Sequence, residues 1–122
     1  GKADYVISLK GNHPALLEDI SLYFEHFSGD LPSCVTKVKD HGRNERRNYR
    51  LLTELSWLPQ RTEWDGLQAV GMVIAAISKN DETTTDTRHF LSSVTDVERF
   101  AYAVRKQLGY RKPAPLVPGC HF

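Results

Sequence analysis

The first part of the chain combines an apolar strand pattern with an amphipathic helix pattern. Residues 4–10 ("DYVISLK") form a β-rich apolar run, which predicts a strand buried on at least one face. The break "GNHP" follows, and Pro14 suits the first turn of a helix. Apolar side chains then recur at helical spacing, which predicts an amphipathic helix over residues 14–27. They are Leu17, Ile20, Phe24 and Phe27.

The middle of the chain has the pattern of an exposed hairpin. Residues 34–40 ("CVTKVKD") alternate weakly and predict an exposed strand, and residues 46–53 ("RRNYRLLT") predict a second one. Between them, "HGRNE" is predicted to be a polar turn. The next stretch, "ELSWLPQ", predicts a short turn of helix that stops at Pro59.

The most apolar stretch covers residues 67–79 ("LQAVGMVIAAISK"), where helix and strand compete. Alternating apolar side chains and the helix-weakening Gly71 favour a central strand. "NDETTTD" is predicted to be a polar turn, and "TRHFLSSV" a further strand.

The last helix is predicted from a capping box at residues 95–98, in which Thr95 would be the N-cap. Its apolar face is Phe100, Ala101 and Val104, with Leu108 as a further candidate. Strands and helices in this order predict a mixed α/β domain of the α+β kind.

Composition narrows the possible functions. A chain of 122 residues with 40% apolar and 25% charged residues is typical of one soluble globular domain. The net charge of +1 gives no global attraction to nucleic acid or membranes, so a DNA-binding surface would be a local patch. No apolar run reaches the length of a membrane span, and no signal peptide is seen, which predicts a cytoplasmic protein. Cys34 and Cys120 are therefore expected to be free thiols, rather than a disulfide or a metal site.

The densest chemical feature is "HGRNERR", residues 41–47. Arginine forks suit phosphate oxygens and histidine can add a donor, so a hairpin tip of this kind could lie on a DNA backbone. The candidates are His41, Arg43, Arg46 and Arg47. The alternative is a solvated polar turn with a local Arg–Glu pair.

Two weaker candidates lie elsewhere. Tyr102 and Arg105, three residues apart, are predicted to share one face of the last helix, which Arg99 extends as a basic strip. They could orient a phosphate, or form only a surface pair. Lys10 and Asn12 lie in a strand-to-helix turn whose N–H groups could hold an anion, although such turns are usually structural. The sequence has no nucleophile elbow, phosphate loop, Rossmann glycine pattern or zinc motif.

Four stretches in this order resemble the C-terminal half of an ISAs1-type insertion-sequence transposase, related to the H-repeat-associated proteins. They are "GKADYVISLKGNHPALLEDI", "HGRNERR", "WDGLQAVGMV" and "TRHFLSSV…RFAYAVRK", and the resemblance covers residues 1 to about 106. It implies a partial ribonuclease-H-like domain with an inserted, mainly antiparallel β segment and a C-terminal helix. Residues 1–109 would be the C-terminal part of the catalytic domain, and residues 110–122 an irregular tail.

The resemblance also implies a chemistry. In DDE transposases, two Asp and one Glu hold two Mg²⁺ ions that activate water or a 3′-hydroxyl for attack on DNA phosphodiesters. Tyr102 and Arg105 match the Tyr-x-x-Arg part of the family signature, on the helix that carries the catalytic Glu. DNA at transposon ends would be the partner.

This chain departs from the family at the catalytic carboxylates. Both family Asp residues are expected upstream of "GKADYV", and Asp4 is not promoted to a ligand. After Lys106 the family pattern is lost, and Arg111 stands where the Glu is expected. No metal site and no cofactor are therefore expected in this chain.

A shift of reading frame by one base explains the lost pattern. One allowed back-translation of residues 107–122, read in the shifted frame, gives Asn-Trp-Gly-Ile-Glu-Asn-Gln-Leu-His-Trp-Tyr-Leu-Asp-Val-Ile, close to the family's own continuation. The sequence therefore predicts a frameshifted transposase fragment that is inactive alone. The alternatives are a non-catalytic DNA-binding remnant and an unrelated α+β interaction domain.

Overall fold

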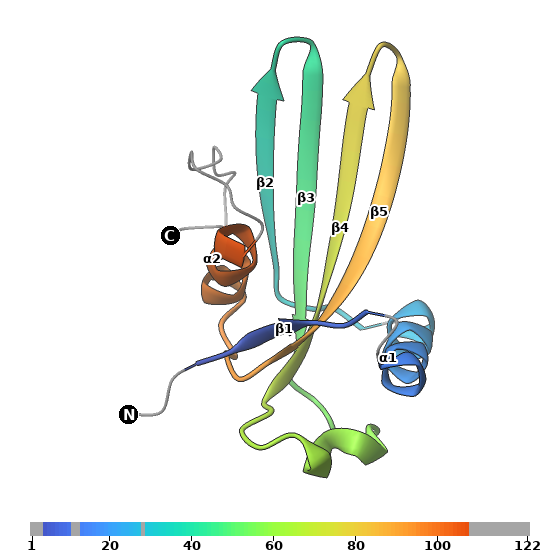
Figure 1. Ribbon diagram of the computed structural model, residues 1–122, viewed down its shortest axis with the longest axis vertical. Helices are drawn as coiled ribbons and strands as arrows, with labels where there is room; N and C mark the ends of the chain where they lie inside the picture. Colours follow the sequence, from blue (N-terminus) through green and yellow to red (C-terminus); the bar gives the residue numbers. More distant parts are fainter. Residues whose placement is uncertain (1–3, 11–12, 28, 108–122) are drawn as a thin grey trace.

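The computed structural model describes residues 4–10, 13–27 and 29–107 (Figure 1). It is a five-stranded antiparallel sheet with two α-helices and a 3₁₀ helix, so the predicted mixed α+β class is confirmed. The elements in chain order are β1 (Val6–Ser8), α1 (Pro14–His26), β2 (Ser33–Asp40), β3 (Arg43–Leu52), η1 (Pro59–Glu63), β4 (Ala69–Lys79), β5 (Glu82–Ser92) and α2 (Val97–Gln107).

The sheet has the strand order β1-β5-β4-β3-β2, with every pair antiparallel. Strands β2 to β5 make two long hairpins, whose tips extend beyond the helices beside the base of the sheet (Figure 1). Each hairpin turns through two residues with positive φ, His41–Gly42 (46° and 79°) and Asn80–Asp81 (53° and 64°). Two left-handed residues in succession match the twist of the flanking strands and allow the tightest hairpin.

These tight turns correct two predictions. "HGRNE" and "NDETTTD" were expected to be polar turns, but in each only the two turn residues leave the strands. Polar composition misled the prediction, because both faces of the hairpin tips are exposed and carry no apolar alternation. The basic cluster of residues 41–47 therefore lies mostly on a strand.

The two faces of the sheet carry separate halves of the core. Strand side chains alternate between faces, so residues directly opposite one another in the register share a face. One face packs against α2 through Phe100, Ala101 and Val104, and the other contacts the α1 side through Leu16 and Ile20. We call them the α2 face and the α1 face. The sheet residues of the α2 cluster are Val6, Cys34, Tyr49, Leu51, Ala69, Val73 and Phe90, and those of the α1 cluster are Leu52, Val70 and Leu91.

The apolar run at residues 67–79 is a strand, as predicted, and Gly71 has a specific role in it. A Cβ at this position would lie 2.2 Å from Cζ of Phe100. Glycine therefore lets the Phe100 ring of α2 lie directly on the backbone of β4.

Two local predictions about helix ends were wrong. Pro59 begins η1 instead of ending a helix, because a proline in a first turn needs no N–H partner. Helix α2 begins at Val97, and Oδ1 of Asp96 accepts the Glu98 N–H at 3.1 Å. Asp96 therefore caps α2 in place of Thr95.

The thiol prediction was wrong for Cys34, which is 2% exposed and disulfide-bonded. Cys120 lies outside the described residues. Across the described ranges, no helix combines the length and apolar character needed to cross a membrane.

Candidate nucleic-acid interface

The β2–β3 hairpin gathers four of the predicted DNA contacts near one tip. His41 is in the turn, Arg43 is the first residue of β3, and Arg46 and Arg47 follow on the same strand. The turn fixes the register, in which Asp40 lies opposite Arg43 and Lys37 opposite Arg46. The tip is thus a continuous antiparallel ribbon.

The three arginines of this hairpin do not share a face. Arg43 and Arg47 project from the α2 face, where both contact the carboxylate of Glu45, at 3.4 Å and 2.5 Å. The Arg47 and Glu45 side chains are only 15% and 11% exposed. The Arg–Glu pair considered as the alternative is therefore present, and it accounts for two of the three arginines.

Arg46 lies on the α1 face and is exposed. His41 is also exposed, and its Nε2 lies 3.2 Å from Oδ1 of Asp40. Of the predicted cluster, Arg46 is the cation that points away from the Glu45 carboxylate.

The structure adds three cations that were not predicted from the sequence. Lys37 and Lys39 of β2, and Arg50 of β3, share the α1 face with Arg46. The alternation in "CVTKVKD" already indicated that Lys37 and Lys39 lie on the same face of a strand. A two-residue turn was needed to place them opposite the arginines.

Arg99 and Lys10, two further predicted contacts, belong to other elements than this hairpin. Arg99 of α2 is paired with Asp4 at 3.4 Å. Lys10 follows β1 and is exposed, and its carbonyl accepts the His13 N–H at 3.0 Å. Asn12 and Arg111 lie outside the described residues.

Tyr102 and Arg105 are separated by burial, which corrects the prediction of one shared helix face. Tyr102 is 56% exposed, whereas Arg105 is 8% exposed. Three residues rotate a helix by about 300°, so the edge of a buried face can fall between them. Arg105 faces the sheet, where it and Arg47 lie near the hydroxyl of Tyr49.

Tyr49 has a raised pKa because its hydroxyl is buried beneath α2. Contacts with Thr36 and the positive charges of Arg47 and Arg105 act in the opposite direction but are weaker than the burial. Burial therefore keeps Tyr49 neutral, and its hydroxyl belongs to the packing of α2.

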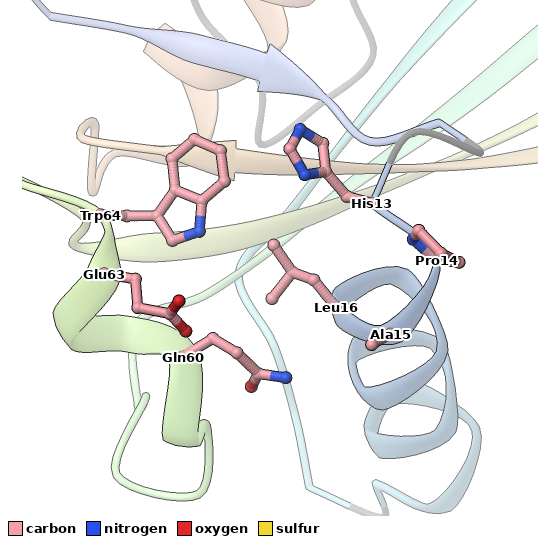
Figure 2. A pocket seen from close by; sticks show the side chains of 7 residues that line it. All are labelled: His13, Pro14, Ala15, Leu16, Gln60, Glu63 and Trp64. Atoms are coloured by element: carbon pink, nitrogen blue, oxygen red, sulfur yellow. The ribbon is translucent and has the colours of Figure 1, made fainter.

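A cavity of about 510 Å³ lies between the start of α1 and η1 (Figure 2). Figure 2 shows Gln60, Glu63 and Trp64 facing His13 and Leu16 across it. Nε2 of Gln60 donates to Asp19 at 2.8 Å, while its buried Oε1 has no partner in the described structure. The cavity offers an indole edge, an amide and a carboxylate, but no cluster of charge.

No group of three or more His, Cys, Asp or Glu side chains comes together as a metal site among the described residues. On the hairpin, the carboxylate of Glu45 is used in two ion pairs. The described residues therefore offer no group of side chains that could bind a catalytic metal ion.

Buried His89 is expected to make stability depend on pH. Burial lowers its pKa below the usual 6.5, and its ring lies 5.8 Å from that of Phe24. The unfolded chain then binds the proton more readily, so stability is fully present above about pH 6.5 and is lost as pH falls toward the lowered pKa. We expect the urea midpoint to fall between pH 7 and pH 5. His89→Gln should flatten this profile, while the exposed control His41→Gln should keep it.

The chain is similar in sequence to a curated protein whose name states no function. The chain is 36% identical over 94 residues to the "Uncharacterized protein in dhlA 3'region" of Xanthobacter autotrophicus, a match covering 75% of this chain and 32% of that relative. The chain thus spans about a third of the length of the curated relative it matches. No family model matches the chain, and no solved structure matches it.

Proposed function

We propose that this chain is the C-terminal part of the catalytic domain of a DDE transposase of the ISAs1 type, and that it is inactive by itself. The family activity would be Mg²⁺-dependent DNA cleavage and strand transfer, with transposon ends as the partner and the cytoplasm as the location. The observation that carries the proposal is the order of four matching stretches, together with an open sheet edge where a ribonuclease-H-like fold needs more strands.

That open edge is the outer side of β1. Tyr5 accepts a backbone hydrogen bond from Ser93, and Leu9 donates one to His89, so both face β5. Along an edge strand, the peptide groups of successive residues point alternately toward the neighbouring strand and away from it. The peptide groups of Val6 and Ser8 therefore point outward. Within the described chain β1 is the end strand of the sheet, and the side chain of Gln107 donates to the Val6 carbonyl. A side-chain amide thus occupies part of the place where another strand would pair.

Two hollows lie beside α2, and the smaller of them is also lined by Val6 of β1. Their volumes are about 390 and 460 Å³, and both are lined by Asp4, Val94 and Ala103. Tyr102 lines the larger one. Space beside α2 and near the outer edge of β1 supports a domain that needs further chain to complete its sheet.

Catalysis by this chain alone is not expected. Three carboxylates neutralise much of the charge of two Mg²⁺ ions, and here the matching positions supply none. An arginine in place of the third carboxylate would repel the metals. The proposal therefore separates the family's chemistry from the residual properties of this product.

We expect no Mg²⁺-dependent nicking of supercoiled plasmid by the purified chain. The assay compares the chain with plasmid in the presence of Mg²⁺ and in the presence of a chelator. Nicking that needs Mg²⁺ and disappears when Arg111 or Tyr102 is changed would contradict the proposal. A contaminating nuclease would survive both changes.

The nucleotide sequence of the gene tests the family assignment directly. Codons 105–122 should be compatible with the shifted reading that restores Glu and the following His-Trp pair. The DNA upstream should encode strands ending in the two Asp residues. Codons that forbid the shifted reading, with no Asp-bearing strand pattern upstream, would favour the unrelated α+β interaction domain.

The second candidate is a non-catalytic DNA-binding remnant, favoured by the basic hairpin. A gel-shift titration against salt measures it, because phosphate contacts make affinity fall steeply with salt. Absence of binding at low salt would remove this candidate and leave the family assignment intact.

A further inference from the structure

The α1 face of the two hairpins carries four positive side chains and no negative one. Its residues on β2 and β3 include Lys37, Lys39, Arg46 and Arg50, and the rest of this face on strands β2 to β5 is neutral. We call these four cations the basic strip. Lys37, Lys39 and Arg46 are exposed and Arg50 is partly so. None of the four has an ion-pair partner within the part of the chain that the structure describes.

The opposite face of the same strands is electrically balanced. Its four cations are Arg43, Arg47, Lys79 and Arg88, and its four carboxylates are Asp40, Glu45, Glu82 and Asp86. Ion pairs join Arg43 and Arg47 to Glu45, and Arg88 to Asp86. The near-zero net charge of the chain therefore hides a strong difference between two faces of one sheet.

The basic strip contains a pair of like charges that destabilises the hairpin locally. Lys37 lies directly opposite Arg46 on the neighbouring strand. Like charges in this position repel one another, whereas the other face places Asp40 opposite Arg43 and Lys79 opposite Glu82. A departure from a local rule at an exposed site is typical of a binding surface.

The shape of the strip favours an extended polyanion over a small anion. The strip extends along the strands from the level of Lys39 to the level of Arg50. This distance is six residues, or about 20 Å. That length corresponds to about six base pairs of duplex. Thr83, Thr85 and Thr87 form a parallel row of exposed hydroxyls on β5 that can donate to phosphate oxygens.

The side chains between these two rows favour a duplex over single strands or membranes. On β4 they include Ile74, Ala76 and Ser78, and the face has no aromatic side chain beyond the level of Arg50. Single-stranded nucleic acids are usually held by stacking on aromatic rings, and peripheral membrane sites insert large apolar side chains. Beyond the level of Arg50 this face offers charged, hydroxyl and amide groups with a few aliphatic side chains, and it has no aromatic ring.

We propose that the basic strip binds the phosphate backbone of duplex DNA without reading its sequence, and that the opposite face takes no part. The inference rests on the proposed DNA-binding function and deepens it, because it selects one face and replaces most of the residues expected from "HGRNERR". Arg46 is the member common to both sets.

Two triple variants with equal charge change test the choice of face. Lys37→Gln/Lys39→Gln/Arg46→Gln removes exposed cations from the basic strip. Arg43→Gln/Lys79→Gln/Arg88→Gln removes exposed cations from the balanced face. Binding of the full chain to a fluorescein-labelled duplex of mixed sequence is followed by anisotropy between 50 and 200 mM NaCl, beside a single strand of equal length.

The first variant should weaken duplex binding at least about tenfold at 50 mM salt and reduce the slope of log K against log salt by about 2.7, since each lost phosphate contact contributes about 0.9. The second variant should keep the affinity within about twofold of wild type. Its slope should differ from the wild-type slope by no more than about 0.9, the contribution of one phosphate contact. The wild-type chain should prefer the duplex to the single strand.

Each contrary result has a distinct meaning. Equal weakening by both variants overturns the face assignment while leaving DNA binding in place. Preference for the single strand overturns the duplex assignment, and absence of wild-type binding overturns both this inference and the DNA-binding candidate. The urea midpoint of the first variant should be no lower than that of wild type, because the change removes mutual repulsion.

Discussion

Replacement of Gly71 by alanine is expected to lower the free energy of unfolding by about 2–3 kcal/mol. The added Cβ would lie 2.2 Å from Cζ and 2.5 Å from Cε1 of Phe100. That ring is 0% exposed and packs edge-on against Phe90, with centroids 5.7 Å apart. It cannot turn aside without disturbing the packing between α2 and the sheet, so the strain is shared by the core.

Urea unfolding followed by circular dichroism measures this loss. Gly42→Ala is the control, because that turn glycine has a φ of +79° and nothing within 4 Å of its added Cβ. It should cost about 1–2 kcal/mol from backbone strain alone. In the double variant Gly71→Ala/Phe100→Leu, a smaller side chain relieves the overlap and should recover part of the loss. An unchanged midpoint for Gly71→Ala would show that Phe100 does not lie on β4 as described.

Replacement of Ile20 by alanine is expected to cost about 3 kcal/mol, because it empties the centre of the α1 cluster. Ile20 is 0% exposed and belongs to the same cluster as Leu58 and Leu91, so its cavity cannot be filled by a small movement of α1. Leu22→Ala is the matched control on the same helix. Leu22 is 47% exposed, so its loss should stay within about 0.5 kcal/mol.

Tryptophan fluorescence makes the Ile20 experiment specific to α1. Both tryptophans lie beside this helix: Trp57 stacks on Tyr23 with ring centroids 3.9 Å apart, and Trp64 meets His13 at 5.4 Å. If α1 leaves the sheet before the rest unfolds, the fluorescence transition will precede the circular dichroism transition. Coincident transitions at an unchanged midpoint would contradict the described docking of α1.

Strand and helix positions with strong apolar patterns could be predicted from the sequence. Residues 67–79 could be predicted as a strand because they form the most apolar run of the chain, and β4 is buried over its first half, from Ala69 to Val73. The polar ends of the hairpins could not be assigned in the same way. At Glu82 to Asp86 both faces meet solvent, and the strand is set by the Asn80–Asp81 turn and by pairing with β4.

The candidate interface was only partly predictable for a related reason. A cluster read along the chain placed Arg43, Arg46 and Arg47 together, but a strand sends neighbouring side chains to opposite faces. The partners that share a face with Arg46 come from β2 and depend on the register. Burial of Arg105 was equally hidden, because a helix pattern does not reveal where its packed face ends.

The two tight turns also bear on how the chain folds. Each long hairpin pairs residues close in sequence, so its ladder can close from the turn with little loss of chain entropy. Strand β1 instead pairs with β5, near the far end of the described chain, and must wait for a long loop to close. We therefore expect the hairpins to form early and β1 late, leaving the edge of β5 available to another strand during synthesis.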